Sequence, residues 1–281
     1  MLKKFSVTNF KGFENKTTLD LGDVRNYAFN EQAIDPEEKI VKLALLYGPN
    51  GIGKSNLCHA IFDIVSNLTD NRVSPTYYES NYSNVNTDPI DLTEFEYLFQ
   101  FKGIPVRYAY GKKSFRKIQY ESLTIGDKTV LHYDKRIIKG KPILAMGGTE
   151  SLNIDLDKID ISLVKYVKAN SILTDTVENI TFNLFFSFVE RMLEFWSLDR
   201  RDFQGFEPLT NNGRNIGRDI IDQKNVEEFK QFLGNIGVEN NIVAEKNPDG
   251  EFDLYYNYKN RKVDFLDNCS SGIRALTLFF F

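Results

Sequence analysis

The residues with the clearest chemistry lie at 48–55, in the order Gly-Pro-Asn-Gly-Ile-Gly-Lys-Ser. This order fits the pattern G-x-x-x-x-G-K-[ST], in which glycines let backbone N–H groups turn inward around phosphate oxygens. We expect Lys54 to contact the β- and γ-phosphates and Ser55 to ligate Mg²⁺. The predicted binding set is Gly48, Pro49, Asn50, Gly51, Ile52, Gly53, Lys54, Ser55 and the adjacent Asn56. A glycine-rich turn without a ligand is the alternative.

The elements around this loop must hold it in place. Ile40–Tyr47 is a short apolar run that predicts a buried strand ending at Gly48. From Ser55 onward, apolar residues recur at helical spacing and predict a helix, whose N-terminal end would attract an anion. A strand, a glycine-rich turn and a helix in this order are typical of nucleotide-binding α/β proteins.

The rest of the chain divides into segments of different periodicity. Alternation of apolar and polar residues predicts two N-terminal strands and a β-rich segment at about 94–145, which begins with a hairpin around Lys102-Gly103-Ile104. Helical spacing predicts three helices, short strands follow, and a last helix is expected from Ser270. The predicted elements are Leu2–Thr8, Thr17–Leu21, Glu94–Lys102, Pro105–Tyr110, Lys117–Thr124, Thr129–Asp134, Asp160–Ala169, Val177–Phe195, Val226–Leu233, Ile242–Ala244, Phe252–Tyr258 and Lys262–Phe265.

The composition narrows the function classes. The 35 basic and 39 acidic residues give a net charge of −4, which does not favour a general nucleic-acid coat, although a local basic face stays open. Only two histidines, His59 and His132, are present, so histidine-rich metal sites are excluded. We expect Cys58 and Cys269 to be reduced thiols, buried or partly buried. Neither a leader-like apolar run nor a membrane-spanning one occurs, so we expect a cytoplasmic protein without membrane contact.

The surroundings of the loop resemble a known family. The stretch "LKKFSVTNFKGFENKTTLDL", followed by "LLYGPNGIGKSNL", resembles the start of the SMC/RecF-like branch of ABC-type ATPases. The later "TEFEYLFQFKGIPVRYAYG" and "IQYESL" resemble the β insert of bacterial AAA-type ATP-binding proteins related to the overcoming-lysogenization-defect ATPases. The tail "VDFLDNCSSGIRAL" resembles their signature motif, usually L-S-S-G-T, with Cys269 and Ile273 in place of leucine and threonine.

This resemblance implies an α/β fold, a P-loop NTPase with an ABC/SMC-like head, a β-rich insert and a helical lobe. The implied parts are a core lobe at 1–93, a β-hairpin insert at 94–150, a helical lobe at 151–240, and return strands with the signature helix at 241–281. It implies that two copies form a homodimer around ATP and Mg²⁺, with the loop of one copy facing Ser270, Ser271 and Gly272 of the other. Lys11 would lie near the nucleotide.

The family also implies a biological role, and it shows which catalytic motif this sequence lacks. Its members serve in phage defence or DNA maintenance, beside an effector or nuclease partner, and DNA contact stays open. Hydrolysis in the family needs a Walker B strand ending in Asp-Glu, and no such run follows Ser271. The catalytic carboxylates are therefore unassigned, and we expect a head that is incomplete at Phe279-Phe280-Phe281. A non-hydrolysing nucleotide-dependent interaction module is the alternative. A P-loop kinase or GTPase is disfavoured, because it would need an acceptor-site carboxylate or an N-K-x-D motif and the sequence shows neither.

Several residues keep a plain structural interpretation beside a functional one. Lys11 is either a turn lysine or a residue near the nucleotide. Ser270-Ser271-Gly272 is either a helix cap or the signature motif. For Gln100 we favour a strand position over a link to Mg²⁺. We favour a β-face position for His132 over a base. For two basic clusters we favour solvated charge over nucleic-acid contacts, and for one aromatic group we favour helix packing over base stacking. The clusters are Lys112, Lys113, Arg116 and Lys117, then Lys135, Arg136, Lys139 and Lys141; the aromatic group is Phe182, Phe185, Phe186, Phe188 and Phe195.

Overall fold

The chain forms two compact units, Met1–Met192 and Leu193–Phe281, and each is described by itself. The four-part division predicted from the sequence stays a prediction. The structure is a computed structural model, and it describes residues 1–25, 30–69, 81–88, 90–137, 141–156, 158, 161–196, 202–205, 220–221, 225–238, 241–247, 250, 252–259, 261–270, 272–273, 276–277 and 280.

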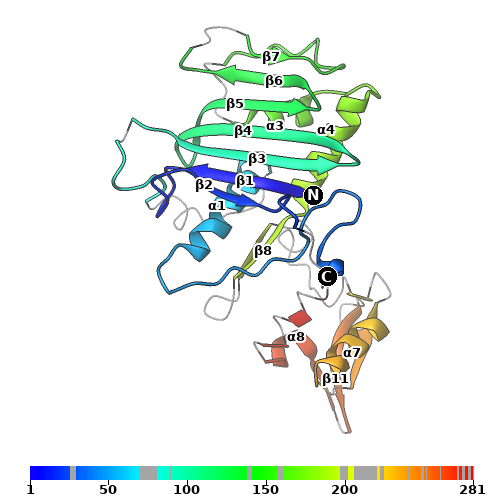
Figure 1. Ribbon diagram of the computed structural model, residues 1–281. Helices are drawn as coiled ribbons and strands as arrows, with labels where there is room; N and C mark the ends of the chain where they lie inside the picture. Colours follow the sequence, from blue (N-terminus) through cyan, green and yellow to red (C-terminus); the bar gives the residue numbers. More distant parts are fainter. Residues whose placement is uncertain are drawn as a thin grey trace. The chain divides into compact units, whose positions relative to one another are not determined.

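The first unit is built on a seven-stranded antiparallel sheet with the order β2-β1-β3-β4-β5-β6-β7 (Figure 1). Strand β1 therefore lies between its sequence neighbour β2 and the distant β3. With its helices, the chain has a mixed α/β fold. The strands are β1 (Leu2–Thr8), β2 (Thr17–Asp20), β3 (Thr93–Phe101), β4 (Ile104–Ser114), β5 (Lys117–Ile125), β6 (Lys128–Asp134) and β7 (Ile143–Leu144).

Alternation of side chains explains why these segments form strands. In β3, Phe95, Tyr97 and Phe99 are buried, while the residues between them face the other side of the sheet. Lys102 and Gly103 connect β3 to β4, with φ values of 51° and 80°. Positive φ at both central residues is what a type I′ hairpin turn requires. The predicted hairpin and the predicted strands of the β-rich segment are confirmed.

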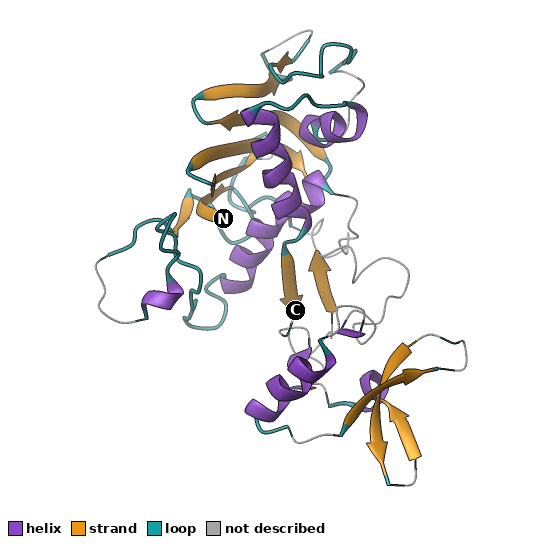
Figure 2. Ribbon diagram, turned by 90° about the vertical axis from the view of Figure 1, so that its right-hand side faces the viewer, coloured by secondary structure: helices purple, strands orange, loops and turns teal. Residues whose placement is uncertain are grey.

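Three helices cover one face of this sheet, as Figure 2 shows. They are α1 (Lys54–Leu68), α3 (Leu163–Asn170) and α4 (Val177–Glu190). The ring of Phe185 packs at 5.4 Å from Phe99 and at 5.6 Å from Tyr108, centroid to centroid. The aromatic residues of α4 therefore pack in the core, as we favoured over base stacking; the side chain of Phe195 lies outside the described residues.

The end of α4 differs from the prediction. The helix was expected over Val177–Phe195, but it ends at Glu190, and Leu193–Trp196 forms strand β8. The buried face of α4 carries Phe182, Phe185 and Phe186, whose aromatic rings remove more apolar area from water than aliphatic side chains do. Ile180 and Leu184, which also recur at helical spacing in this segment, are exposed instead.

The predicted strand at Ile40–Tyr47 is wrong for the structure described here. Ile40 is buried, but Leu45 is 89% exposed and Tyr47 is 91% exposed. The backbone of Val41 bonds to Leu21, and no strand of the described chain pairs with the residues that follow. An apolar run forms a strand only where a neighbouring strand takes its hydrogen bonds, so this segment reaches the glycine-rich loop without forming a strand.

A buried ion pair joins α1 to the sheet. The Nζ atom of Lys112 lies 2.6 Å from Oδ1 of Asp63, and the side chains are 2% and 0% exposed. The hydroxyls of Tyr110 and Tyr82 each donate to the same carboxylate at 2.8 Å. The interpretation of Lys112 as solvated charge is therefore wrong. Lys112 continues the alternation of Tyr108 and Tyr110 along β4, which turns it toward α1.

A second buried carboxylate, Glu121 on β5, joins the sheet to α3. Its oxygens accept hydrogen bonds from the Tyr108 hydroxyl at 2.6 Å, from the Ser162 hydroxyl at 2.5 Å and from the Leu163 N–H at 2.7 Å. Burial raises the pKa of Glu121 because the charged form loses water, while these hydrogen bonds work in the opposite direction.

The second unit has its own small core. A three-stranded antiparallel sheet of β10 (Ile242–Lys246), β11 (Phe252–Tyr258) and β12 (Arg261–Asp264) packs with α7 (Val226–Asn235) and α8 (Phe265–Asn268). β8 (Leu193–Trp196) and β9 (Asp202–Gly205) form a separate antiparallel pair. Phe280 packs 5.1 Å from the Phe229 ring. Phe279 and Phe281 lie outside the described residues.

Within the described ranges, no helix has the length and apolar character needed to cross a membrane.

We predict that Lys112→Met destabilises the protein by about 3 kcal/mol, because it leaves the Asp63 carboxylate buried without its cation. Lys113→Met is the matched control, since its side chain is exposed and its loss should change stability by less than about 0.5 kcal/mol. Urea unfolding of both variants measures the difference. Equal effects of the two substitutions would contradict the role assigned to the buried pair.

We also predict a distinct pH dependence from Glu121. Its native pKa is raised above the ordinary value of 4.5, so the native state holds the proton more tightly than the unfolded chain. The contribution of this group to stability therefore falls as pH rises from about 4.5 through the native pKa. Unfolding free energies of wild type and Glu121→Gln, measured from pH 4 to pH 8, should differ in slope over this window. Parallel curves would show that Glu121 does not titrate in this way.

Candidate functional site

The glycine-rich loop at 48–53 leads directly into α1. Gly51 and Gly53 have φ values of 82° and 105°, in the region that L-residues rarely occupy. A β-carbon at Gly53 would lie 3.3 Å from the ring of Phe13. Both glycines are therefore required by backbone conformation, and Gly53 also by close approach.

Lys54 is the first residue of α1, and its side chain folds back over the loop. Its ammonium donates to the carbonyl oxygens of Gly48 at 2.8 Å and of Pro49 at 2.9 Å. These two bonds hold the loop in a closed curve around the cation. The positive charge is thus placed inside the loop, where an anion bound by the backbone would meet it.

The start of α1 has no side-chain cap. Gly53 occupies the N-cap position and provides no hydrogen-bonding side chain, and the first intrahelical bond runs from the Leu57 N–H to the Gly53 carbonyl at 2.9 Å. The N–H groups of the first turn, including those of Ser55 and Asn56, therefore point out of the helix end. Together with the helix dipole they form a site suited to phosphate oxygens.

The turn after β1 lies against this loop. Its backbone closes through bonds between Phe10 and Phe13, whose N–H groups donate to each other's carbonyls at 2.9 and 2.7 Å. A β-carbon at Gly12 would lie 3.3 Å from Nδ2 of Asn56, and Phe13 approaches Gly53 as described above. The two N-terminal motifs of the sequence therefore meet at the start of α1.

Lys11 sits in this turn with a left-handed backbone, at φ 47°. Partial burial lowers the pKa of its ammonium, because the charged form loses part of its hydration. Its Nζ atom lies 5.7 Å from the centroid of the Phe10 ring. Lys11 is consequently a second positive charge on an element that touches the loop.

The expected signature residues belong to the second compact unit. The Ser270 hydroxyl accepts a hydrogen bond from the Ile273 N–H at 3.2 Å, so it caps the helical turn that includes Gly272, and the predicted serine cap is confirmed. Gly272 is exposed, and Ser271 lies outside the described residues. These residues are not placed relative to the glycine-rich loop.

Gln100 is a strand residue, as we favoured. It pairs with the beginning of β1, where its carbonyl accepts from the Met1 amino group at 2.6 Å and its side chain accepts from Lys3 at 3.0 Å. The Lys11 turn follows the other end of β1, roughly 20 Å away along the strand. His132 likewise occupies strand β6 and pairs with Ser122.

In the described part of the chain, one residue of each basic cluster lies among acidic side chains. Lys113 and Arg136, one from each cluster, line a hollow of about 560 Å³ together with Glu14, Asp91 and Glu94. Arg136 forms an ion pair with Asp134 at 2.7 Å. Positive and negative side chains thus alternate here, which does not favour a nucleic-acid contact. Lys139 lies outside the described residues.

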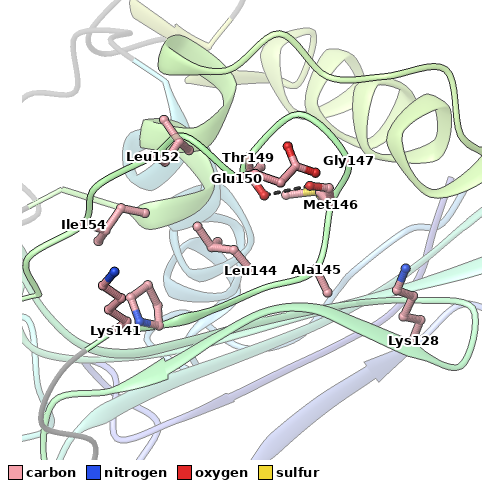
Figure 3. Close-up of a pocket in the computed structure, with 11 residues that line it drawn as sticks. Lys128, Lys141, Leu144, Ala145, Met146, Gly147, Thr149, Glu150, Leu152 and Ile154 are labelled. Atoms are coloured by element: carbon pink, nitrogen blue, oxygen red, sulfur yellow. Dashed lines mark hydrogen bonds between the residues drawn. The ribbon is translucent and has the colours of Figure 1, made fainter.

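Another pocket of about 470 Å³ lies beside β6 and β7, lined by Leu144, Leu152 and Ile154 among others (Figure 3). Two of its polar side chains are already bonded within the fold. The Thr149 hydroxyl donates to the Met146 carbonyl at 2.7 Å, and the Glu150 carboxylate accepts from the N–H of Gly148. The hydroxyl and the carboxylate are thus turned toward their own loop, and we assign the pocket no function.

The described residues contain no group of three or more His, Cys, Asp or Glu side chains that could hold a metal ion. The exposed hydroxyl of Ser55, at the second position of α1, is an oxygen ligand of the kind that Mg²⁺ accepts. Because Mg²⁺ keeps several waters and binds phosphate oxygens, one hydroxyl beside a bound triphosphate is compatible with it.

No protein-family model matches this chain. A search of curated proteins also returned no match.

Sequence reasoning missed the residues that support the site. Asp63 lies among apolar residues of α1, and its burial could be inferred from helical period alone. Tyr82 and Asn84 lie in a stretch rich in Asn and Ser that predicts only a loop. Their contacts with the Lys11 turn have no signature in a single sequence.

Proposed function

We propose that this chain is an ATP-binding head of the ABC/SMC-like type, which binds MgATP at residues 48–55. One observation carries the proposal: the Lys11 turn and the glycine-rich loop, which are the two parts of the sequence resemblance, meet at the uncapped start of α1. Lys54 and a helix N-terminus then lie at a place suited to a polyphosphate, and Lys11 belongs to the turn that touches it.

The site would work by exchange of hydrogen bonds. The Lys54 ammonium donates to the carbonyls of Gly48 and Pro49. A bound triphosphate would offer charged acceptors instead, and hydrogen bonds to charged groups are stronger than those to neutral carbonyls. Ser55 would hold Mg²⁺, which neutralises charge on the phosphates. Lys11 would add a positive charge from the neighbouring turn.

The proposal includes self-association on ATP. The helix start capped by Ser270 carries exposed Gly272, and a helix N-terminus attracts the γ-phosphate of ATP held by a second copy. The role in phage defence or DNA maintenance, the effector or nuclease partner and the cytoplasmic location rest on the sequence alone and belong to the same proposal. DNA contact stays open, and the mixed charges around Lys113 and Arg136 do not favour it there.

We predict that Lys54→Ala weakens ATP binding by about 10- to 100-fold, since it removes charge-assisted hydrogen bonds worth roughly 1.5–3 kcal/mol. Isothermal titration calorimetry with MgATP measures the affinity. Lys42→Ala is the control, because it removes the same charge from an exposed lysine on the segment before the loop. Unchanged affinity in Lys54→Ala would overturn the proposed nucleotide site.

Turnover separates the ATPase from the interaction module. Phosphate release is measured with wild type and Lys54→Ala under conditions that saturate the wild-type site. Release by wild type that is lost in the variant supports hydrolysis at this site. Binding without release supports the non-hydrolysing module.

We also predict that Ser270→Asp blocks ATP-dependent dimerisation. Aspartate caps helices as well as serine does, so the helix start is kept, but its carboxylate would repel the γ-phosphate of the partner's ATP. Light scattering with a non-hydrolysable ATP analogue should give a dimer for wild type and a monomer for the variant. Asn268→Asp adds the same charge nearby and should still dimerise. A Ser270→Asp dimer would exclude this contact.

A further inference from the structure

The backbone of Lys11 is held by a short segment far away in the sequence. The Lys11 N–H donates to the Tyr82 carbonyl at 3.0 Å, and the Asn84 side-chain amide donates to the Lys11 carbonyl at 2.7 Å. Both backbone groups of this residue are therefore bonded to residues 82–84. A lysine at φ 47° is in a sparsely populated conformation, so these bonds help to maintain it.

Asn84 is itself held in a single orientation. Its side-chain oxygen accepts from the Asn86 N–H at 2.8 Å, and its backbone N–H donates to the side-chain oxygen of Asn9 at 2.9 Å. Asn9 also has a left-handed backbone, at φ 53°. Only 8% of Asn84 is exposed. Its amide is thus aimed at the Lys11 carbonyl by two further hydrogen bonds.

The same segment is anchored to the helix that follows the glycine-rich loop. The Tyr82 hydroxyl donates to Oδ2 of Asp63 at 2.8 Å, and its ring packs edge-on against Phe10, 5.4 Å between centroids. Asp63 belongs to α1, whose first residue is Lys54. A continuous path of bonds therefore connects the helix that carries Lys54 to the turn that carries Lys11.

From these contacts we propose that Asn84 is a positioning residue for Lys11: it orients the turn so that the Lys11 ammonium reaches the phosphates of the nucleotide. This inference rests on the proposed function. Asn84 does not touch the nucleotide in this scheme, and it acts only through Lys11. Tyr82 fixes the position of the same segment relative to α1.

The test is a double-mutant cycle on ATP affinity. Asn84→Ala removes the amide donor, and Lys11→Met removes the ammonium while it keeps an unbranched side chain. In the wild-type background, Asn84→Ala should weaken MgATP binding by about 3- to 10-fold, the loss expected for one hydrogen bond. In the Lys11→Met background it should change the affinity by less than about 2-fold, because the group that it positions is absent. Asn86→Ala is the matched control in the same segment, and it should leave the affinity unchanged.

Thermal unfolding of the four proteins separates positioning from general stability. A purely structural role of Asn84 would lower the unfolding temperature and the affinity to the same extent in both backgrounds, and this result would overturn the inference. The inference would also fail if Lys11→Met left ATP binding unchanged while Lys54→Ala abolished it, although the proposed function would then stand. Retained binding in Lys54→Ala would instead refute the proposed function itself.

Discussion

The arrangement of the first unit depends on one buried carboxylate. Asp63 is fully buried on α1, and it accepts hydrogen bonds from Tyr82, Tyr110 and Lys112, which come from two separate parts of the chain. A carboxylate removed from water is costly unless such donors surround it, so the positions of helix, strand β4 and the segment at 82–84 depend on one another. Together with the bonds from Asn67 to Tyr108 and from Tyr97 to the Ala60 carbonyl, this constraint fixes α1 on the sheet and so places its N-terminal end.

The candidate site uses the frame that Asp63 creates. The glycine-rich loop leads into the N-terminal end of α1. The Lys11 turn is bonded to the segment at 82–84, which Asp63 holds through Tyr82. The relative position of the loop and the turn is therefore set by the folded framework and not by one flexible side chain. Since supporting residues with fixed orientation are what a precise binding site requires, this framework suits the proposed nucleotide site.

Much of the sheet could be predicted from the sequence, because alternation along β3 and β4 and the Lys102-Gly103 turn are local signals. The glycine-rich loop could also be predicted, because its pattern at 48–55 is contiguous in the sequence. The predictions failed where the outcome depended on distant partners. Leu45 and Tyr47 looked like parts of a buried strand, but a strand needs a neighbour that local sequence does not reveal. Lys112 looked solvated by its charge, although Asp63, 49 residues before it, provides a buried partner.

The order of the strands also affects how the chain folds. The N-terminal amino group bonds to Gln100, 99 residues later, and β1 lies in the sheet between β2 and β3. During synthesis, β1 and β2 must therefore wait as an isolated hairpin, which is marginal in water, until β3 has left the ribosome. Closing so long a loop costs entropy before the strands pair, and this slows folding. The glycine-rich loop and α1 lie inside that loop, so a nucleotide that needs both the Lys11 turn and α1 is expected to bind after the sheet has closed.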